Sequence, residues 1–366
     1  MRNCFVLFCV TSTLFPPPLL SQAIRYTIAD LEEGTNQFGV VYAMNAYGDV
    51  VGDANFQAFV WSHGTMSTPA SLANSFSTAR GINDLGQVVG GFAPNGTSMA
   101  FLLDSGVVTK LDVPAGITGS LAAAINNQGE VLVNTSDVSG STAFLWAHGA
   151  QRQIPSLGGF IEANALNQLG QVVGDSSPAG TASSHAFLWA GGQSIDLGVL
   201  PGGEAGGDCG FCVAPNFSTA TAINDSAEIV GQSAAAGQVL HAFLWRGGGM
   251  EDLGTLPGDN RSYATAINSR GQIAGWSGHA TGVIIDYTRA VLWSDGTIVK
   301  LDELIPADSG WTIDIAAAIN NSGQIAGTGH RNGLARPFLL TPIRPSLSTS
   351  CSSTKMSVGC GPKIKD

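Results

Sequence analysis

Side chains able to do chemistry gather in two stretches of the chain, at residues 276–288 and 306–313. Both stretches combine aromatic rings with carboxylates. Exposed rings can stack on a sugar or a peptide, whereas rings that anchor a loop would be partly buried. We expect these stretches to be loops, and their candidate ligand-binding residues are Trp276, His279, Asp286, Tyr287, Asp308 and Trp311.

Two histidines, His185 and His241, stand at matching places in similar segments, each at the start of His-Ala-Phe-Leu-Trp. A histidine pair can contribute to a metal site, but four-coordinate zinc needs further ligands and the sequence identifies none. Packing at a rim or in a loop is the alternative role. Both residues are kept as ligand-binding candidates, and the sequence predicts no metal site and no cofactor.

Four cysteines lie beyond the N-terminal apolar stretch, and their close spacing favours two local disulfides in an oxidising compartment. The predicted pairs are Cys209–Cys212 and Cys351–Cys360. A redox Cys-x-x-Cys or half of a zinc site are the alternatives for the first pair. The redox motif normally opens a helix of a βαβ unit, and a zinc site needs a second pair of ligands, so neither is favoured.

These candidates must be positioned by a unit that recurs seven times, in which a strand of small residues closes on an asparagine. The intervals between the asparagines are 38, 43, 41, 57, 44 and 52 residues. A period in the forties made of strands is typical of propeller blades. The asparagines are Asn45, Asn83, Asn126, Asn167, Asn224, Asn268 and Asn320.

Each unit contains four short strand-like runs, as the unit at residues 220–253 illustrates. Its runs are residues 220–224, 228–231, 241–245 and 250–253, and turn residues separate them. Four strands per unit is the composition of a propeller blade. After the asparagine, a type I turn places glycine at its fourth position, where a left-handed conformation is needed. Ala227 occupies this position in one unit, so we expect a different turn there.

The order of strands within a blade follows from their composition. The alanine-rich strand fits the crowded axis, and the strand that alternates polar and apolar residues belongs at the solvated rim. Residues 24–31 form a rim strand with no preceding blade, whereas the last unit ends at residues 337–340 without one. The predicted fold is therefore all-β, a seven-bladed propeller of four antiparallel strands per blade, closed by the N-terminal strand completing the last blade.

The repeating pattern Ala-Ile-Asn, Gly-Gln-Val-Val-Gly, His-Ala-Phe-Leu-Trp and Leu-Gly-x-Leu-Pro-Gly-Gly resembles the extracellular repeat family named for its His-Ala-Phe (HAF) triplet. The resemblance covers about residues 26–340, although the naming histidine occurs only as His185 and His241. It implies export and a propeller-like fold. It implies no activity and no catalytic residue.

The ends of the chain differ from the repeats. Arg2, an apolar run and the small residues 21–23 predict a signal peptide over residues 1–23, with the propeller at 24–342. Residues 343–366, rich in Ser, Lys and Pro, are expected to be a flexible tail. The apolar run is too short to span a membrane, so we expect an exported protein, extracellular or periplasmic, with no membrane span after signal removal.

The net charge of −11 excludes electrostatic attraction to nucleic acid or anionic lipid. We expect a monomer.

Three functions stay open: a non-catalytic binding propeller for a glycan or protein ligand, a secreted carbohydrate-active hydrolase or lyase, and a structural envelope protein. The long connections share one face of the ring, which favours that face for binding. A carboxylate pair with perturbed titration at the channel mouth would favour the enzyme. No Gly-x-Ser-x-Gly, His-Glu-x-x-His or Walker motif occurs in the sequence.

Overall fold

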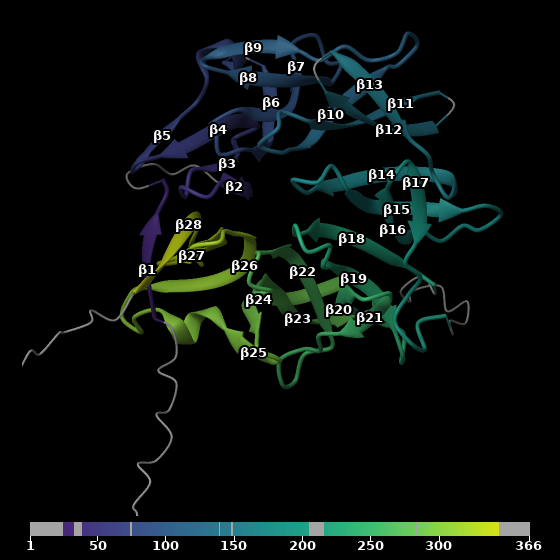
Figure 1. Ribbon diagram of the computed structural model, residues 1–366. Coiled ribbons are helices and arrows are strands. Elements are labelled where there is room, and N and C mark those ends of the chain that lie inside the picture. The colour runs from purple at the N-terminus through teal and green to yellow at the C-terminus, as the bar shows by residue number, and fades with distance from the viewer. Residues whose placement is uncertain are drawn as a thin grey trace, which may run out of the picture.

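The computed structural model describes residues 25–32, 39–73, 75–138, 140–147, 149–204, 216–282 and 284–343. Within these residues the chain forms seven sheets, each of four antiparallel strands. The sheets are arranged in a ring, and the chain passes from one to the next around it (Figure 1). The fold prediction is confirmed.

Six blades are each built from four consecutive strands. Blade 1 holds β2 (Gly39–Met44), β3 (Val50–Ala54), β4 (Gln57–Ser62) and β5 (Thr65–Ser67). Blade 2 holds β6 (Phe76–Ile82), β7 (Val88–Ala93), β8 (Met99–Asp104) and β9 (Val107–Lys110). Blade 3 holds β10 (Gly119–Ile125), β11 (Val131–Asp137), β12 (Gly140–Ala147) and β13 (Ala150–Ile154). Blade 4 holds β14 (Gly158–Leu166), β15 (Val172–Pro178), β16 (His185–Ala190) and β17 (Gln193–Asp196). Blade 5 holds β18 (Ser218–Ile223), β19 (Ile229–Ala235), β20 (Val239–Arg246) and β21 (Gly249–Asp252). Blade 6 holds β22 (Arg261–Ile267), β23 (Ile273–Thr281), β24 (Ile284–Ser294) and β25 (Thr297–Lys300).

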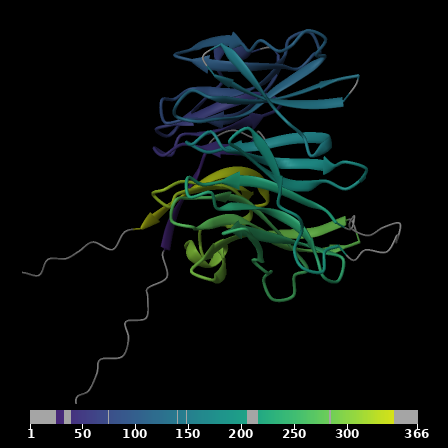
Figure 2. The same ribbon diagram turned by 45° about the vertical axis from the view of Figure 1, so that its right-hand side comes forward.

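Blade 7 joins the two ends of the described chain. It consists of β26 (Trp311–Ile319), β27 (Ile325–Arg331), β28 (Leu334–Ile343) and β1 (Arg25–Asp30). Strand β1 pairs antiparallel with β28, with Tyr26 opposite Pro342 and Asp30 opposite Phe338. The purple and yellow strands lie side by side in both views (Figures 1 and 2). Two short 3-10 helices, η1 (Ala70–Leu72) and η2 (Leu301–Leu304), lie in the connections from rim to centre.

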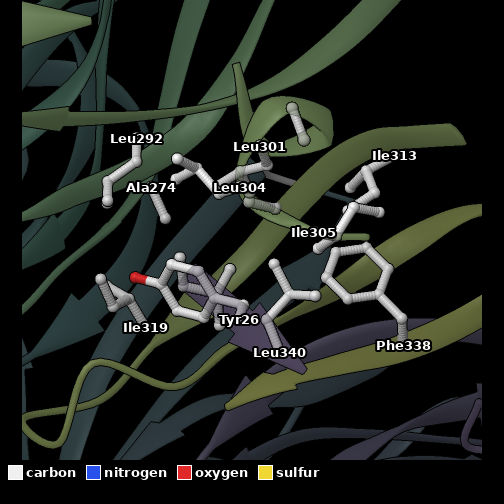
Figure 3. Packing of buried hydrophobic residues seen from close by; sticks show 13 residues of the cluster. Tyr26, Ala274, Leu292, Leu301, Leu304, Ile305, Ile313, Ile319, Phe338 and Leu340 are labelled. Carbon is white, nitrogen blue, oxygen red and sulfur yellow. The ribbon is translucent and has the colours of Figure 1, made fainter. Parts of the chain in front are cut away.

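The N-terminal strand also contributes to the core. Tyr26 is 1% exposed and packs in one hydrophobic cluster with Phe338 and Leu340 of blade 7 and with Leu292 of blade 6. Leu301 and Leu304 of η2 cover the same cluster (Figure 3). Closure of the ring is therefore a matter of side-chain packing as well as of strand pairing.

A repeated glycine in the second strand of most blades has a steric cause. The inner strands contain a bulge, for example between Ala79 and Gly81 of β6, which brings their backbone against the neighbouring strand. A Cβ atom on Gly90 would lie 1.9 Å from the carbonyl oxygen of Thr78, and one on Gly174 would lie 2.0 Å from that of Glu162. A side chain at Gly90 or Gly174 would therefore require the facing backbone to move.

The seven asparagines form a closed ring of hydrogen bonds around the axis, which the sequence analysis did not predict. The side-chain amide of each donates to the main-chain carbonyl of the asparagine in the next blade, at 3.0–3.3 Å, and Asn320 completes the circle onto Asn45. The side-chain oxygen accepts from two backbone N–H groups of its own turn, as Asn126 does from Gln128 and Glu130. The repeat thus links neighbouring blades as well as forming turns.

The expectation of a different turn at Ala227 is wrong. Ala227 adopts a φ of 58°. Its N–H donates to the Asn224 carbonyl at 3.1 Å, as the glycines do in the other blades. The asparagine contacts fix the turn strongly enough to hold an alanine in a left-handed conformation.

Several predictions fall outside the described residues. These are the signal peptide at 1–23, the tail beyond Ile343, and the cysteines Cys209, Cys212, Cys351 and Cys360. Ile343 itself is the last residue of β28 and pairs with Arg25. Among the described residues, no helix has the length and apolar character that a membrane crossing requires.

Candidate functional site

The two faces of the ring differ in their connections. One face, which we call the short-turn face, carries the asparagine turns and the turns between third and fourth strands. The other, the long-loop face, carries the turns between second and third strands and the connections from a rim strand to the next inner strand.

The two matched histidines pair with carboxylates of their own blades. His185 Nδ1 lies 2.9 Å from Asp196, and His241 Nδ1 lies 2.8 Å from Asp252. Burial alone would raise the pKa of Asp252, but hydrogen bonds from His241 and from the Gly254 N–H lower it below its usual value. Each histidine therefore ties the third strand to the rim strand. No set of three metal-ligating side chains is found in the described part of the chain.

The segment at residues 276–288 is a long hairpin and not the predicted loop. His279 on β23 and Asp286 on β24 are hydrogen-bonded at 2.8 Å, and Thr281 donates to the same carboxylate. Tyr287 stacks on His279 with ring centres 6.1 Å apart, and its hydroxyl donates to Asp259 at 3.0 Å. The structure brings these predicted residues together, but their polar groups satisfy one another.

The other predicted aromatic residues do not join this cluster. Trp276 lies within β23, is 8% exposed and packs edge-to-face on Tyr263. Trp311 begins β26 and packs on Phe338 with ring centres 6.1 Å apart. Asp308 is exposed in the turn that precedes β26. The two tryptophans therefore anchor blades 6 and 7, and do not form one stacking platform with Tyr287.

A cavity of about 360 Å³ occupies the central channel toward the long-loop face. Its walls come from all seven inner strands, which converge on the axis (Figure 1). The lining includes Tyr42, Arg80, Glu162 and Tyr263. The Arg80 guanidinium lies over the Tyr42 ring, 4.0 Å from its centre. Burial raises the pKa of Tyr42, while the charge of Arg80 opposes this shift.

Glu162, which lines this cavity, is one of two neighbouring carboxylates in blade 4. Glu162 on β14 is directly opposite Asp175 on β15 in the register of blade 4. Burial raises the pKa of Asp175, a hydrogen bond from Thr219 opposes the shift, and the charge of Glu162 adds to it. Burial, with the charges of Asp175 and Glu162, raises the pKa of Tyr263 to about 12. The pair meets part of the criterion for an enzyme, because one carboxylate has a raised pKa and the other lines the channel.

Between blades 1 and 2 the long-loop face carries an exposed pair of phenylalanines. Phe56 is 71% and Phe76 68% exposed, and their rings pack edge-to-face with centres 5.9 Å apart. The pair lies between two cavities of about 220 and 450 Å³ and lines both. Asp53, which accepts a hydrogen bond from Thr78 at 3.1 Å, lines the smaller cavity. The charge of Asp53 also contributes to the raised pKa of Tyr42, which lines the channel.

Phe56 has an unusual backbone conformation for its residue type. It is the second residue of a two-residue turn in which both φ angles are positive, 49° at Asn55 and 63° at Phe56. The comparable two-residue turns of the described chain have glycine at this second place, at Gly64, Gly106, Gly192, Gly248, Gly296 and Gly333. A bulky residue in this conformation is strained by about 1–2 kcal/mol.

Phe56, Phe76, Tyr42 and Arg80 were not among the sequence-predicted candidates. The usable signal was departure from the repeat. Phe56 stands where the other turns have glycine. Arg80 and Tyr42 stand three residues before the asparagine, where the other inner strands have alanine, threonine or asparagine.

No protein-family model matches the chain, and no curated protein matches it in sequence. Among solved structures, acylaminoacyl peptidase from Pyrococcus horikoshii is similar over 86% of this chain and 53% of its own length, with 13% identity and a TM-score of 0.50. YCF48 bound to D1 peptide matches 88% of this chain and 97% of its own, with 10% identity and a TM-score of 0.49. The extracellular domain of BT4673 from B. thetaiotaomicron matches 86% of this chain, with 9% identity and a TM-score of 0.48, and this chain spans 39% of it. At such identity, the likeness to the peptidase concerns the fold alone.

Proposed function

We propose that this protein is an exported, non-catalytic binding propeller that holds a glycan on its long-loop face, with Phe56 and Phe76 as the stacking platform. Export, to the extracellular space or the periplasm, and membership of the HAF repeat family belong to the same proposal. The observation that carries it is the exposed phenylalanine pair at the seam of blades 1 and 2.

Strain at Phe56 supports a role for its side chain. A glycine would relieve the turn, and the six comparable turns contain one. Backbone strain that persists in a folded protein is concentrated at functional sites. The Phe56 side chain is mostly exposed, so burial in the core does not account for its presence.

The surroundings of the pair favour a glycan over a protein partner. Two concave cavities border the rings, and a small or narrow ligand fits such spaces better than the broad surface of a protein does. Asp53, Thr78 and Ser98 line the smaller cavity and offer carboxylate and hydroxyl groups for hydrogen bonds to a sugar. Apolar ring faces beside polar acceptors match the two kinds of surface that a sugar presents.

A glycan array probed with the secreted chain tests this proposal. Binding by the wild-type protein, and its loss in Phe56→Gly and Phe76→Ala, are the expected results. Tyr47→Ala is the matched control, because Tyr47 is 72% exposed in an asparagine turn on the short-turn face. Binding by Phe56→Gly at the wild-type level would refute this choice of surface. A second variant set, Tyr287→Ala and His279→Ala, tests the β23–β24 hairpin as the alternative surface.

A carbohydrate-active hydrolase or lyase is the second candidate, and the pair Glu162–Asp175 favours it. The raised pKa of Asp175 would suit a general acid, with Glu162 as the second carboxylate of the pair. The test is release of reducing ends from the glycans that bind the array. Turnover that disappears in both Glu162→Gln and Asp175→Asn would establish the enzyme, and binding without turnover would reject it.

A further inference from the structure

One position of the repeat lines the channel in every blade, three residues before the ring asparagine. Its occupants are Tyr42, Arg80, Ala123, Asn164, Thr221, Thr265 and Ala317. Among these seven, Arg80 alone carries a charge. Glu162, from β14, adds a negative charge to the same cavity. Strand β10 contacts both β6 and β14 and lies between them in the ring, so the two charges come from different parts of the wall.

The guanidinium of Arg80 makes no hydrogen bond or ion pair with any residue that the structure describes. Its Nε is buried without a partner. The contact that holds it is the face of Tyr42, at 4.0 Å. Other arginines in this acidic chain pair with carboxylates, as Arg246 does with Glu251 and Arg331 with Asp30. Arg80 is therefore held against Tyr42, while the N–H donors at the end of its guanidinium have no partner among the described residues.

Strand β6 connects this arginine to the phenylalanine pair. Phe76, Thr78 and Arg80 stand two residues apart, so they share one face of the strand. At about 3.3 Å per residue, Phe76 and Arg80 are roughly 13 Å apart along the strand. A single elongated ligand can therefore contact the rings at the rim of the channel and the guanidinium inside it.

We infer that the channel mouth is a carboxylate-binding site, and that the glycan of the long-loop face is an acidic one containing uronic acid. This inference rests on the proposed function, since the phenylalanine pair supplies the sugar-stacking surface. A planar guanidinium binds a carboxylate through two parallel hydrogen bonds, which a neutral sugar hydroxyl cannot reproduce. The carboxylate of one uronic acid residue would bind Arg80, and the neighbouring sugar rings would extend along β6 toward Phe76.

The experiment is titration calorimetry of the full secreted chain with two probes. One is a trigalacturonate, and the other is the same trisaccharide with its carboxylates reduced to alcohols. We expect the wild-type protein to bind the acidic probe about 10- to 100-fold more tightly, the usual range for hydrogen bonds to a charged group. Arg80→Gln should bind both probes equally, and Arg80→Lys should keep part of the preference.

The matched control is Arg152→Gln. Arg152 lies over Trp189 at 4.4 Å, but on the exposed rim strand β13, so its loss should leave both affinities unchanged. Thermal melts check that the Arg80 variants are folded. Tyr42→Phe keeps the ring under Arg80 and should keep the preference for the acidic probe.

The outcomes separate the two proposals. Equal affinity of the wild-type protein for both probes, with both lost in Phe56→Gly, would overturn the carboxylate site and leave glycan binding intact. If neither probe binds and no glycan on the array binds, both proposals are overturned. A peptide with a free C-terminal carboxylate is the third probe. Suppose that this peptide binds the wild-type protein but not Arg80→Gln, that its C-terminal amide does not bind, and that no sugar binds. The ligand is then a peptide, and the assignment of a glycan is wrong.

Discussion

Replacement of Phe56 by glycine removes the proposed sugar platform and relieves the turn that carries it. Three effects on stability oppose one another. Relief of the left-handed conformation at φ 63° stabilises the fold by about 1–2 kcal/mol. Loss of the edge-to-face contact with Phe76 costs about 0.5–1.5 kcal/mol. The greater freedom of glycine in the unfolded chain costs about 0.5–1 kcal/mol.

These effects nearly cancel, so we expect Phe56→Gly to change the free energy of unfolding by no more than about 1 kcal/mol. Phe56→Ala loses the same ring contact but keeps a side chain at positive φ. It should therefore be less stable than Phe56→Gly by about 1 kcal/mol. Gly333→Phe supplies the reciprocal measurement, because Gly333 follows Asn332 in the same kind of turn and a Cβ there meets open space.

The assays are urea denaturation for stability and titration calorimetry for glycan binding. Both Phe56 variants should weaken binding about 10- to 30-fold, the usual loss when an aromatic anchor is truncated, although their stabilities differ. Equal stability of Phe56→Gly and Phe56→Ala would show that the turn is not strained. The reason for assigning Phe56 a function would then be lost. Unchanged binding in both variants would refute the platform itself.

Three further predictions concern the scaffold. Tyr26→Ala removes a fully buried ring from the closing strand and should destabilise the fold by about 3–5 kcal/mol in urea denaturation, whereas Thr27→Ala, on the exposed side of β1, should change it little. Asn126→Ala breaks the hydrogen-bonded ring and leaves buried backbone groups unpaired, which should lower the free energy of unfolding by about 2–4 kcal/mol. Asn127→Ala, at the exposed neighbouring residue, should lower it by less than about 1 kcal/mol. Similar losses of stability in both variants would contradict a role for the ring. Burial raises the pKa of Glu32 to about 7, so the folded chain holds this proton more tightly than the unfolded chain. The stability that results is complete below about pH 4.5 and is lost as the pH rises through 7, by at most about 3 kcal/mol. Glu32→Gln should remove this decline from denaturation midpoints measured between pH 4.5 and 8.

The architecture was predictable because every blade repeats the same sequence pattern. The seven asparagines give the number of blades, and the alternating fourth strand identifies the rim. The unpaired run before Leu31 predicts closure onto the strand of Phe338, which the structure confirms. The ring of asparagine hydrogen bonds was not predictable from one repeat, because it depends on where the next blade places its carbonyl group.

The candidate site was harder to predict, because its residues lie in segments of ordinary length and not in the long connections between strands. Residues 276–288 looked like a loop since they exceed the usual strand length, but β23 and β24 extend into a paired hairpin there. Trp276 then falls inside a strand and becomes buried. In contrast, Phe56 and Arg80 lie in segments of ordinary length, where only their residue types are unusual for the position.

Different residues contribute to stability and to ligand recognition at the two ends of the central channel. At the short-turn face the same asparagine recurs in every blade, so the ring is nearly symmetric and its hydrogen bonds are used within the protein. At the long-loop face the equivalent positions hold different residues, and Arg80 retains unused donors. A symmetric set of groups cannot orient an asymmetric ligand, whereas one arginine at one place in the ring can. Substitutions at the asparagine ring should therefore lower stability with little change in ligand preference, and substitutions at Arg80 should do the reverse. A large loss of stability in Arg80→Gln without any change in preference would contradict this division.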